Sequence, residues 1–133
     1  MLRMDELDAT LVLRAGGWDP RYAVTLAVAS HDGVGAALID TNGDDVDVDL
    51  DMYERDFTGV WREGASSGVG NVGAFLSGNA AVAWGRAAPG LVVDIQYSGQ
   101  RYQVVTAETG WWLFVALAVS GSDDLPIYIG ASG

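Results

Sequence analysis

The sequence predicts an all-β protein with the architecture of an antiparallel β-sandwich. Apolar residues recur at every second position in short runs, and Gly, Asn and Asp separate these runs. No window of about 11 residues shows an apolar stripe with helical spacing. About eight or nine short strands of this kind are typical of an immunoglobulin-like or transthyretin-like sandwich.

The N-terminal strands alternate between apolar and polar side chains. Turn residues at positions 31–33 and 41–43 mark reversals of the chain, because Asn, Asp and Gly tolerate the positive φ of a tight hairpin. The sequence therefore predicts strands over 8–14, 23–30, 35–40 and 46–52.

Residues 64–79 are rich in glycine and small residues, and we predict that they form a long crossover loop between two sheets. The roughly 60 residues on each side would make marginal domains by themselves. We therefore expect residues 1–133 to fold as a single domain.

The C-terminal half is richer in aromatic residues, with expected strands over 80–85, 91–97, 101–106, 111–119 and 126–129. The run 111–119 is apolar on both faces, since Trp111 and Leu113 share one side while Trp112 and Phe114 share the other. Either the N-terminal half or the glycine-rich segment 64–79 covers the second face, or Trp112 and Phe114 form a dimer contact. A third possibility is the stacking of a sugar on Trp112 or Trp18.

Residues 82–99 and 104–115 carry a recognisable order of elements. Gly85 is followed by small residues and Pro89, then by an apolar strand, a threonine-led strand, a turn at Gly110 and an aromatic strand. This order resembles carboxypeptidase-regulatory and transthyretin-like domains over about a third of the chain. The resemblance implies an immunoglobulin-like sandwich with a structural or interaction role, and it supplies no catalytic residue.

An acidic segment follows the turn at 41–43, with aspartate at every second residue of the predicted strand. Alternation places Val46, Val48, Leu50 and Met52 on one face and the aspartates on the other. The segment partly matches a calcium-binding loop, although Asp45 replaces its turn glycine and Asp51 its final glutamate. The candidate ligands are Asp40, Asn42, Asp44, Asp47, Asp49 and Asp51. The same face could instead be simply solvated, or it could dock a basic protein.

Composition excludes several classes of function. Seven basic and 18 acidic residues give a net charge of −11, which opposes binding to nucleic acid or to an anionic membrane. Cysteine is absent, so thiol chemistry and disulfides are excluded. The acidic N-terminal segment lacks the features of a signal peptide, and the longest apolar run is too short to span a bilayer as a helix. We therefore expect a cytoplasmic protein.

Catalytic signatures are weak. His31 is the only histidine and lies next to Asp32 in a predicted turn. These two residues and Ser66 or Ser67 are the residue types of a catalytic triad, but no nucleophile motif surrounds either serine. We predict a non-enzymatic module for protein interaction or structure that needs no cofactor. The alternative is a small-ligand module for carbohydrate or calcium.

Overall fold

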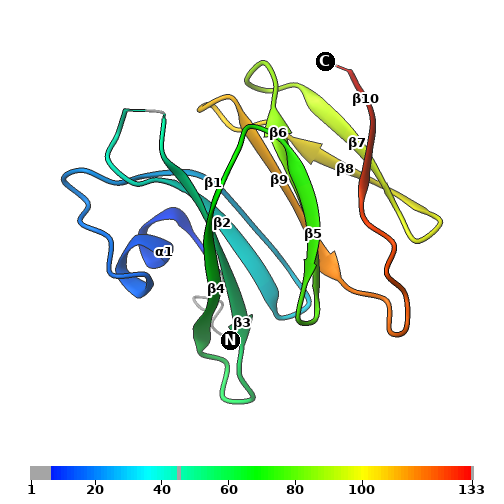
Figure 1. Cartoon of the computed structure of the whole chain (residues 1–133), viewed down its shortest axis with the longest axis horizontal. Coiled ribbons are helices and arrows are strands. Elements are labelled where there is room, and N and C mark those ends of the chain that lie inside the picture. Colours follow the sequence, from blue (N-terminus) through cyan, green and yellow to red (C-terminus); the bar gives the residue numbers. More distant parts are fainter. Residues whose placement is uncertain (1–6, 45, 133) are drawn as a thin grey trace.

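The computed structural model describes residues 7–44 and 46–132. This part of the chain contains one short helix and ten strands (Figure 1). Their bounds are α1 (Ala9–Ala15), β1 (Val24–His31), β2 (Val34–Asp40), β3 (Val48–Arg55), β4 (Trp61–Val69), β5 (Gly73–Ser77), β6 (Ala80–Arg86), β7 (Val92–Tyr97), β8 (Gln100–Val105), β9 (Trp111–Leu117) and β10 (Ile127–Ser132).

The strands of the described residues form three antiparallel sheets, so the predicted all-β class is confirmed. The first sheet has the order β1-β2-β3-β4, the middle sheet β5-β6-β9 and the third sheet β10-β7-β8. From left to right, Figure 1 shows α1, the first sheet, the middle sheet and the third sheet as successive layers. The first sheet is a meander of consecutive strands, whereas immunoglobulin-like sandwiches are built from two sheets with Greek-key connections.

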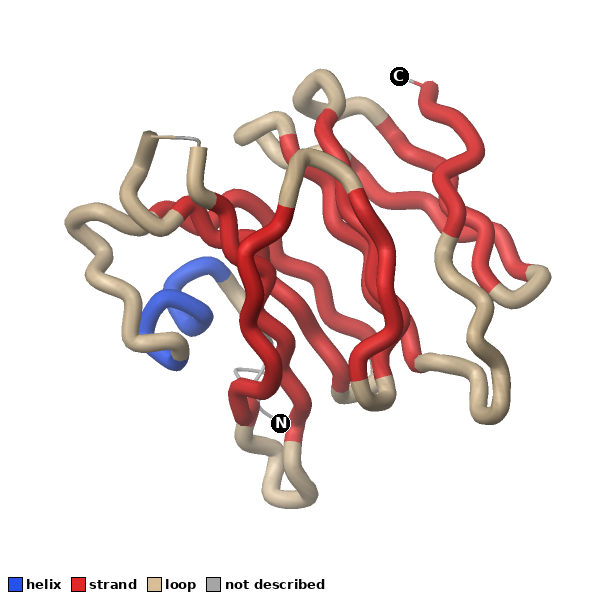
Figure 2. Tube along the Cα trace, in the orientation of Figure 1, coloured by secondary structure: helices blue, strands red, loops and turns tan. Residues whose placement is uncertain are grey.

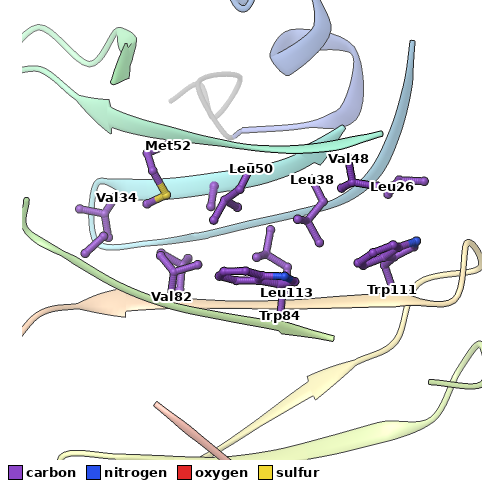
Figure 3. Packing of buried hydrophobic residues seen from close by; sticks show 13 residues of the cluster. Leu26, Val34, Leu38, Val48, Leu50, Met52, Val82, Trp84, Trp111 and Leu113 are labelled. Atoms are coloured by element: carbon purple, nitrogen blue, oxygen red, sulfur yellow. The ribbon is translucent and has the colours of Figure 1, made fainter. Parts of the chain in front are cut away.

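The first and middle sheets share the largest apolar cluster. Leu38 and Leu50 point down from the first sheet toward Val82, Trp84 and Leu113 of the middle sheet (Figure 3). Leu38 and Val82 are fully buried, and Leu50 is 1% exposed. Burial of a side chain of this size contributes about 1.5–3 kcal/mol to folding, so this cluster holds the two layers together.

The middle and third sheets share a second cluster, in which Trp112 and Phe114 pack against Val93, Ile95 and Tyr97 of β7. Trp112 is 3% exposed and Phe114 is 4% exposed. The third sheet therefore covers the second apolar face of β9 with residues that follow the glycine-rich segment. The prediction that the N-terminal half or the glycine-rich segment covers this face is wrong. A dimer contact on Trp112 and Phe114 does not fit this packing, because neither side chain reaches the surface of the chain.

The N-terminal segment is a helix where the sequence analysis predicts a strand. The side chain of Asp8 accepts a hydrogen bond from the backbone N–H of Leu11 at 2.8 Å and caps the helix, and Gly16 ends it. Val12 packs against the outer face of the first sheet, in a cluster with Ile39 and Tyr53. The alternation of Thr10 and Val12 suggested a strand, but the acidic cap and this packing favour the helix.

The glycine-rich segment 64–79 also differs from its prediction. It is not a long loop, because it contains most of β4 and all of β5, which are joined by residues 70–72 (Figure 2). The chain does cross between sheets here, since β4 belongs to the first sheet and β5 to the middle sheet. Gly73 is required at this crossing, because a Cβ there would lie 2.5 Å from the ring of Trp84.

Two predicted hairpin turns are confirmed. The turn predicted at 31–33 is one of them, since Asp32 and Gly33 have positive φ between β1 and β2. The other is the turn expected between the strands 91–97 and 101–106, where Ser98 and Gly99 have positive φ between β7 and β8. In the described residues, no helix is long and apolar enough to cross a membrane.

Candidate functional site

The acidic strand β3 has the predicted alternation. Val48, Leu50 and Met52 are buried in the core between the first and middle sheets. Val46 is 72% exposed, so the prediction that it joins the core is wrong. Its position precedes β3, where the chain has not yet entered the sheet.

Asp51 is buried on the other face of β3 and is 3% exposed. Its Oδ2 accepts a hydrogen bond from Nε1 of Trp18 at 2.8 Å, and its Oδ1 accepts one from the hydroxyl of Ser66 at 2.6 Å. Trp18 follows α1, and Ser66 is opposite Asp51 on β4. The carboxylate therefore links the segment after α1 to β3 and β4, which is a structural role that the sequence pattern did not reveal.

The remaining candidate calcium ligands are divided among separate structural roles. Asp40 is buried at the end of β2 and accepts a hydrogen bond from the N–H of Gly43 at 3.0 Å, while Asp44 accepts one from the N–H of Val46 at 3.0 Å. Asn42 and Asp47 are exposed. Among the described residues, no group of three or more acidic or histidine side chains is arranged to hold a metal ion. Calcium binding stays a prediction, and Asp45 lies outside the described residues.

Asp49 has the least favourable surroundings in the acidic row. Burial raises the pKa of its carboxyl, and the nearby charges of Asp51 and Asp47 raise that pKa further. Four positions further along β3, Tyr53 donates its hydroxyl to the carbonyl of Val12 at 3.2 Å, and burial raises the pKa of this phenol well above its usual value. The face is thus a partly desolvated contact with α1 and the segment after it, whereas Asp47, which precedes β3, is exposed.

The structure does not bring His31 together with Ser66 or Ser67 in a catalytic arrangement. The imidazole of His31 is 3.2 Å from the carboxylate of Asp32 in the exposed β1–β2 turn. Ser66 donates its hydroxyl to Asp51, and Ser67 donates its hydroxyl to the carbonyl of Gly68 at 3.3 Å. No hydrogen bond among the described residues joins either serine to the histidine.

A different surface stands out on the third sheet. Ile127, Tyr128 and Ile129 of the edge strand β10 are 59%, 53% and 39% exposed, and we call these three residues the β10 edge. Tyr128 stacks on Trp112, with ring centroids 6.0 Å apart and an interplanar angle of 21°. Tyr128 therefore covers Trp112, where a dimer contact or sugar stacking was predicted. The exposed apolar surface lies on β10 instead.

Sequence reasoning found β10 as a short last strand but missed its surface. The signal was present, because residues 127–129 are three consecutive large apolar residues, which an alternating half-buried strand does not have. The bulge between Tyr128 and Gly130 places Ile129 outside the regular pairing with β7.

Comparison with protein-family models, with curated proteins and with solved structures finds no match to this chain. The resemblance of residues 82–115 to carboxypeptidase-regulatory and transthyretin-like domains thus stays a prediction. Function is inferred from the geometry of the described residues.

Proposed function

We propose that this protein is a non-enzymatic interaction module of the β-sandwich type, and that it self-associates by pairing β10 with β10 of a second copy. The sandwich assignment is supported by the two apolar clusters, one on each side of the middle sheet. The interaction is supported chiefly by one observation, the exposed apolar β10 edge.

An exposed sheet edge offers backbone N–H and C=O groups to any other strand. Natural proteins commonly protect such edges with charged residues, proline or bulges. β10 has no charged residue and no proline over Ile127–Ser132, and its one bulge lies between Tyr128 and Gly130. By contrast, the edge strand β4 carries exposed charges at Arg62 and Glu63 and small residues beyond them. The difference favours β10 over β4 as the pairing edge.

A second copy suits this edge for reasons of symmetry. Antiparallel pairing of β10 with itself forms a closed two-fold contact, which limits assembly to a dimer. It also joins the two third sheets into one continuous sheet and brings the apolar side chains of the two β10 edges together. A contact limited to one strand from each copy falls below the about 1,200 Å² of a standard interface, so we expect a weak dimer.

The net charge of −11 on each copy opposes this dimer. Salt screens the repulsion, with a Debye length of about 8 Å at physiological ionic strength. We therefore expect dimerisation to strengthen as salt increases. Binding of a basic protein would show the opposite trend, because salt would screen an attraction.

The test is sedimentation of the wild-type chain at increasing concentration up to about 200 µM, in about 0.05 and about 0.5 M NaCl. We expect a monomer–dimer equilibrium that shifts toward dimer at the higher salt. The double variant Ile127→Lys/Ile129→Lys should be monomeric, because charged edges repel and both positions are exposed.

The matched control is Phe57→Lys/Val60→Lys, which adds the same charge at positions that are 100% and 47% exposed in the β3–β4 connection. This control should dimerise at least as well as the wild type. Hydrogen exchange provides an independent measurement, since amides of residues 127–132 should become more protected as concentration rises. A wild type that stays monomeric at high salt, or a β10 variant that still dimerises, would overturn the proposal.

A further inference from the structure

An open pocket of about 620 Å³ lies on the opposite side of the molecule from β10, between α1, the segment after it and the start of β1. Its walls are mainly apolar and include Leu13, Trp18, Pro20, Ala23 and Val24. Val24 is 45% exposed here, so the lining includes apolar surface that the fold leaves open to solvent. Pockets of roughly 300–1,000 Å³ with such lining are typical of small-molecule sites.

The indole of Trp18 is held in place as one wall of this pocket. Its Nε1 donates to the buried carboxylate of Asp51 at 2.8 Å, which anchors the ring to β3. Gly16 lets the ring lie against the backbone, because a Cβ there would be 2.8 Å from Cδ1 and Nε1 of Trp18. The polar atom of the indole is thus already paired, and the ring can offer apolar contact to a ligand without a further cost for an unsatisfied donor.

Arg14 supplies the charge at this pocket. Among the residues that the structure describes, it is the only charged one in the lining. Among the described residues close in sequence to the pocket, Asp8 caps α1 and Asp19 forms an ion pair with Arg21 at 2.9 Å, so both carboxylates already have partners. An apolar cavity with one cation and no carboxylate in its lining complements a ligand that has an apolar body and one negative charge.

We propose that this pocket binds a small amphipathic carboxylate. The apolar chain or ring of the ligand lies against Leu13, Trp18 and Val24, and its carboxylate pairs with the guanidinium of Arg14. This site is independent of the β10 edge, which belongs to the third sheet.

Three probes with the same apolar chain and different head groups test the proposal: decanoate, decanol and decyltrimethylammonium, each below its micelle concentration. Binding is followed by NMR through the indole N–H signal of Trp18, which the variant Trp18→Phe identifies. We expect decanoate to bind at least about tenfold more tightly than decanol, and the cationic probe to bind most weakly.

Two variants distinguish the contribution of the charge of Arg14 to binding affinity from that of the apolar pocket wall. Arg14→Gln should lower the affinity for decanoate to that for decanol, about tenfold, and leave the affinity for decanol unchanged. Gly16→Ala should weaken both probes, because the added Cβ displaces the indole. The matched control is Gly70→Ala, where a Cβ meets nothing within 4 Å, and it should bind like the wild type.

The absence of any response at Trp18 to all three probes would overturn the binding site. Equal or tighter binding of the cationic probe, or an unchanged affinity of Arg14→Gln for decanoate, would overturn the assignment of a carboxylate ligand. Sedimentation of Arg14→Gln and Gly16→Ala should match the wild type, so failure of this proposal and failure of dimerisation through β10 are distinguishable.

Discussion

Strands β3 and β10 depart in opposite directions from the rule that polar residues are exposed and apolar residues buried. On β3, the carboxylate of Asp51 is 3% exposed, whereas on β10 the side chain of Ile127 is 59% exposed. Both lie on the strand face that is turned away from a neighbouring sheet: Asp51 pairs with Ala37 of the α1-facing cluster, and Ile127 is opposite the exposed Gln96. What differs is the covering, because the segment containing Trp18 lies over the face of β3 and no described element lies over Ile127.

The comparison shows that the covering element decides whether a strand face is solvated. Asp51 tolerates burial because it receives hydrogen bonds from Trp18 and Ser66. Ile127 and Ile129 have no such covering in the single chain, and apolar surface of this kind is typical of interaction sites. Buried polar groups and exposed apolar groups are therefore the informative positions of this molecule.

The largest expected effect concerns Trp112, on which Tyr128 of β10 stacks. Trp112→Ala should lower the free energy of unfolding by about 3–5 kcal/mol, because it leaves a cavity between the middle and third sheets and removes the ring under Tyr128. Urea unfolding followed by circular dichroism measures the change. Trp112→Phe is the conservative control and should lose less. If Trp112→Ala kept wild-type stability, the packing of the third sheet on β9 would be contradicted.

The strands of this fold were the part most open to prediction. Alternation located β3, and an apolar pattern on both faces of residues 111–119 predicted a strand that must be covered twice. Both followed from local spacing. The helix α1 was missed because Thr10 and Val12 mimic a strand pattern, whereas its stabilising contact with Tyr53 joins residues 41 positions apart.

The candidate sites were harder to predict. The aspartate row was visible in the sequence, but the burial of Asp51 depends on Trp18, which is 33 residues away. Trp112 was correctly recognised as part of a face that needs covering, but only the position of Tyr128 above it shows that the exposed apolar surface lies on β10. Such pairings depend on how the sheets stack, and spacing along the chain does not encode this directly.

An intermediate effect is expected from removing the buried carboxylate. Asp51→Ala should lower the free energy of unfolding by about 1–3 kcal/mol, because Nε1 of Trp18 and the hydroxyl of Ser66 lose their acceptor. Asp51→Asn keeps one acceptor oxygen and should cost less. Asp47→Ala removes an exposed aspartate from the same row and should change stability by no more than about 0.5 kcal/mol. Equal effects of Asp47→Ala and Asp51→Ala in urea unfolding would mean that the row is uniformly solvated.

The smallest effect is a pH dependence at Asp49. Its pKa is raised in the folded state by burial and by Asp51, so the native protein binds this proton more tightly than the unfolded chain does. The resulting stabilisation is fully present below the unfolded pKa of about 3.9, and it is lost as pH rises through the raised folded pKa.

Asp49→Asn should therefore be more stable than the wild type at neutral pH, and this advantage should shrink as pH falls toward about 4. Urea unfolding of the two proteins across this range gives the difference directly. Asp47→Asn removes the same charge from an exposed position and controls for the general relief of repulsion along β3. A difference between Asp49→Asn and wild type that does not vary with pH would show that Asp49 titrates alike in the folded and unfolded chains. In that case Asp51 would be the one desolvated carboxylate among the described aspartates of β3, and the contrast with β10 would rest on it alone.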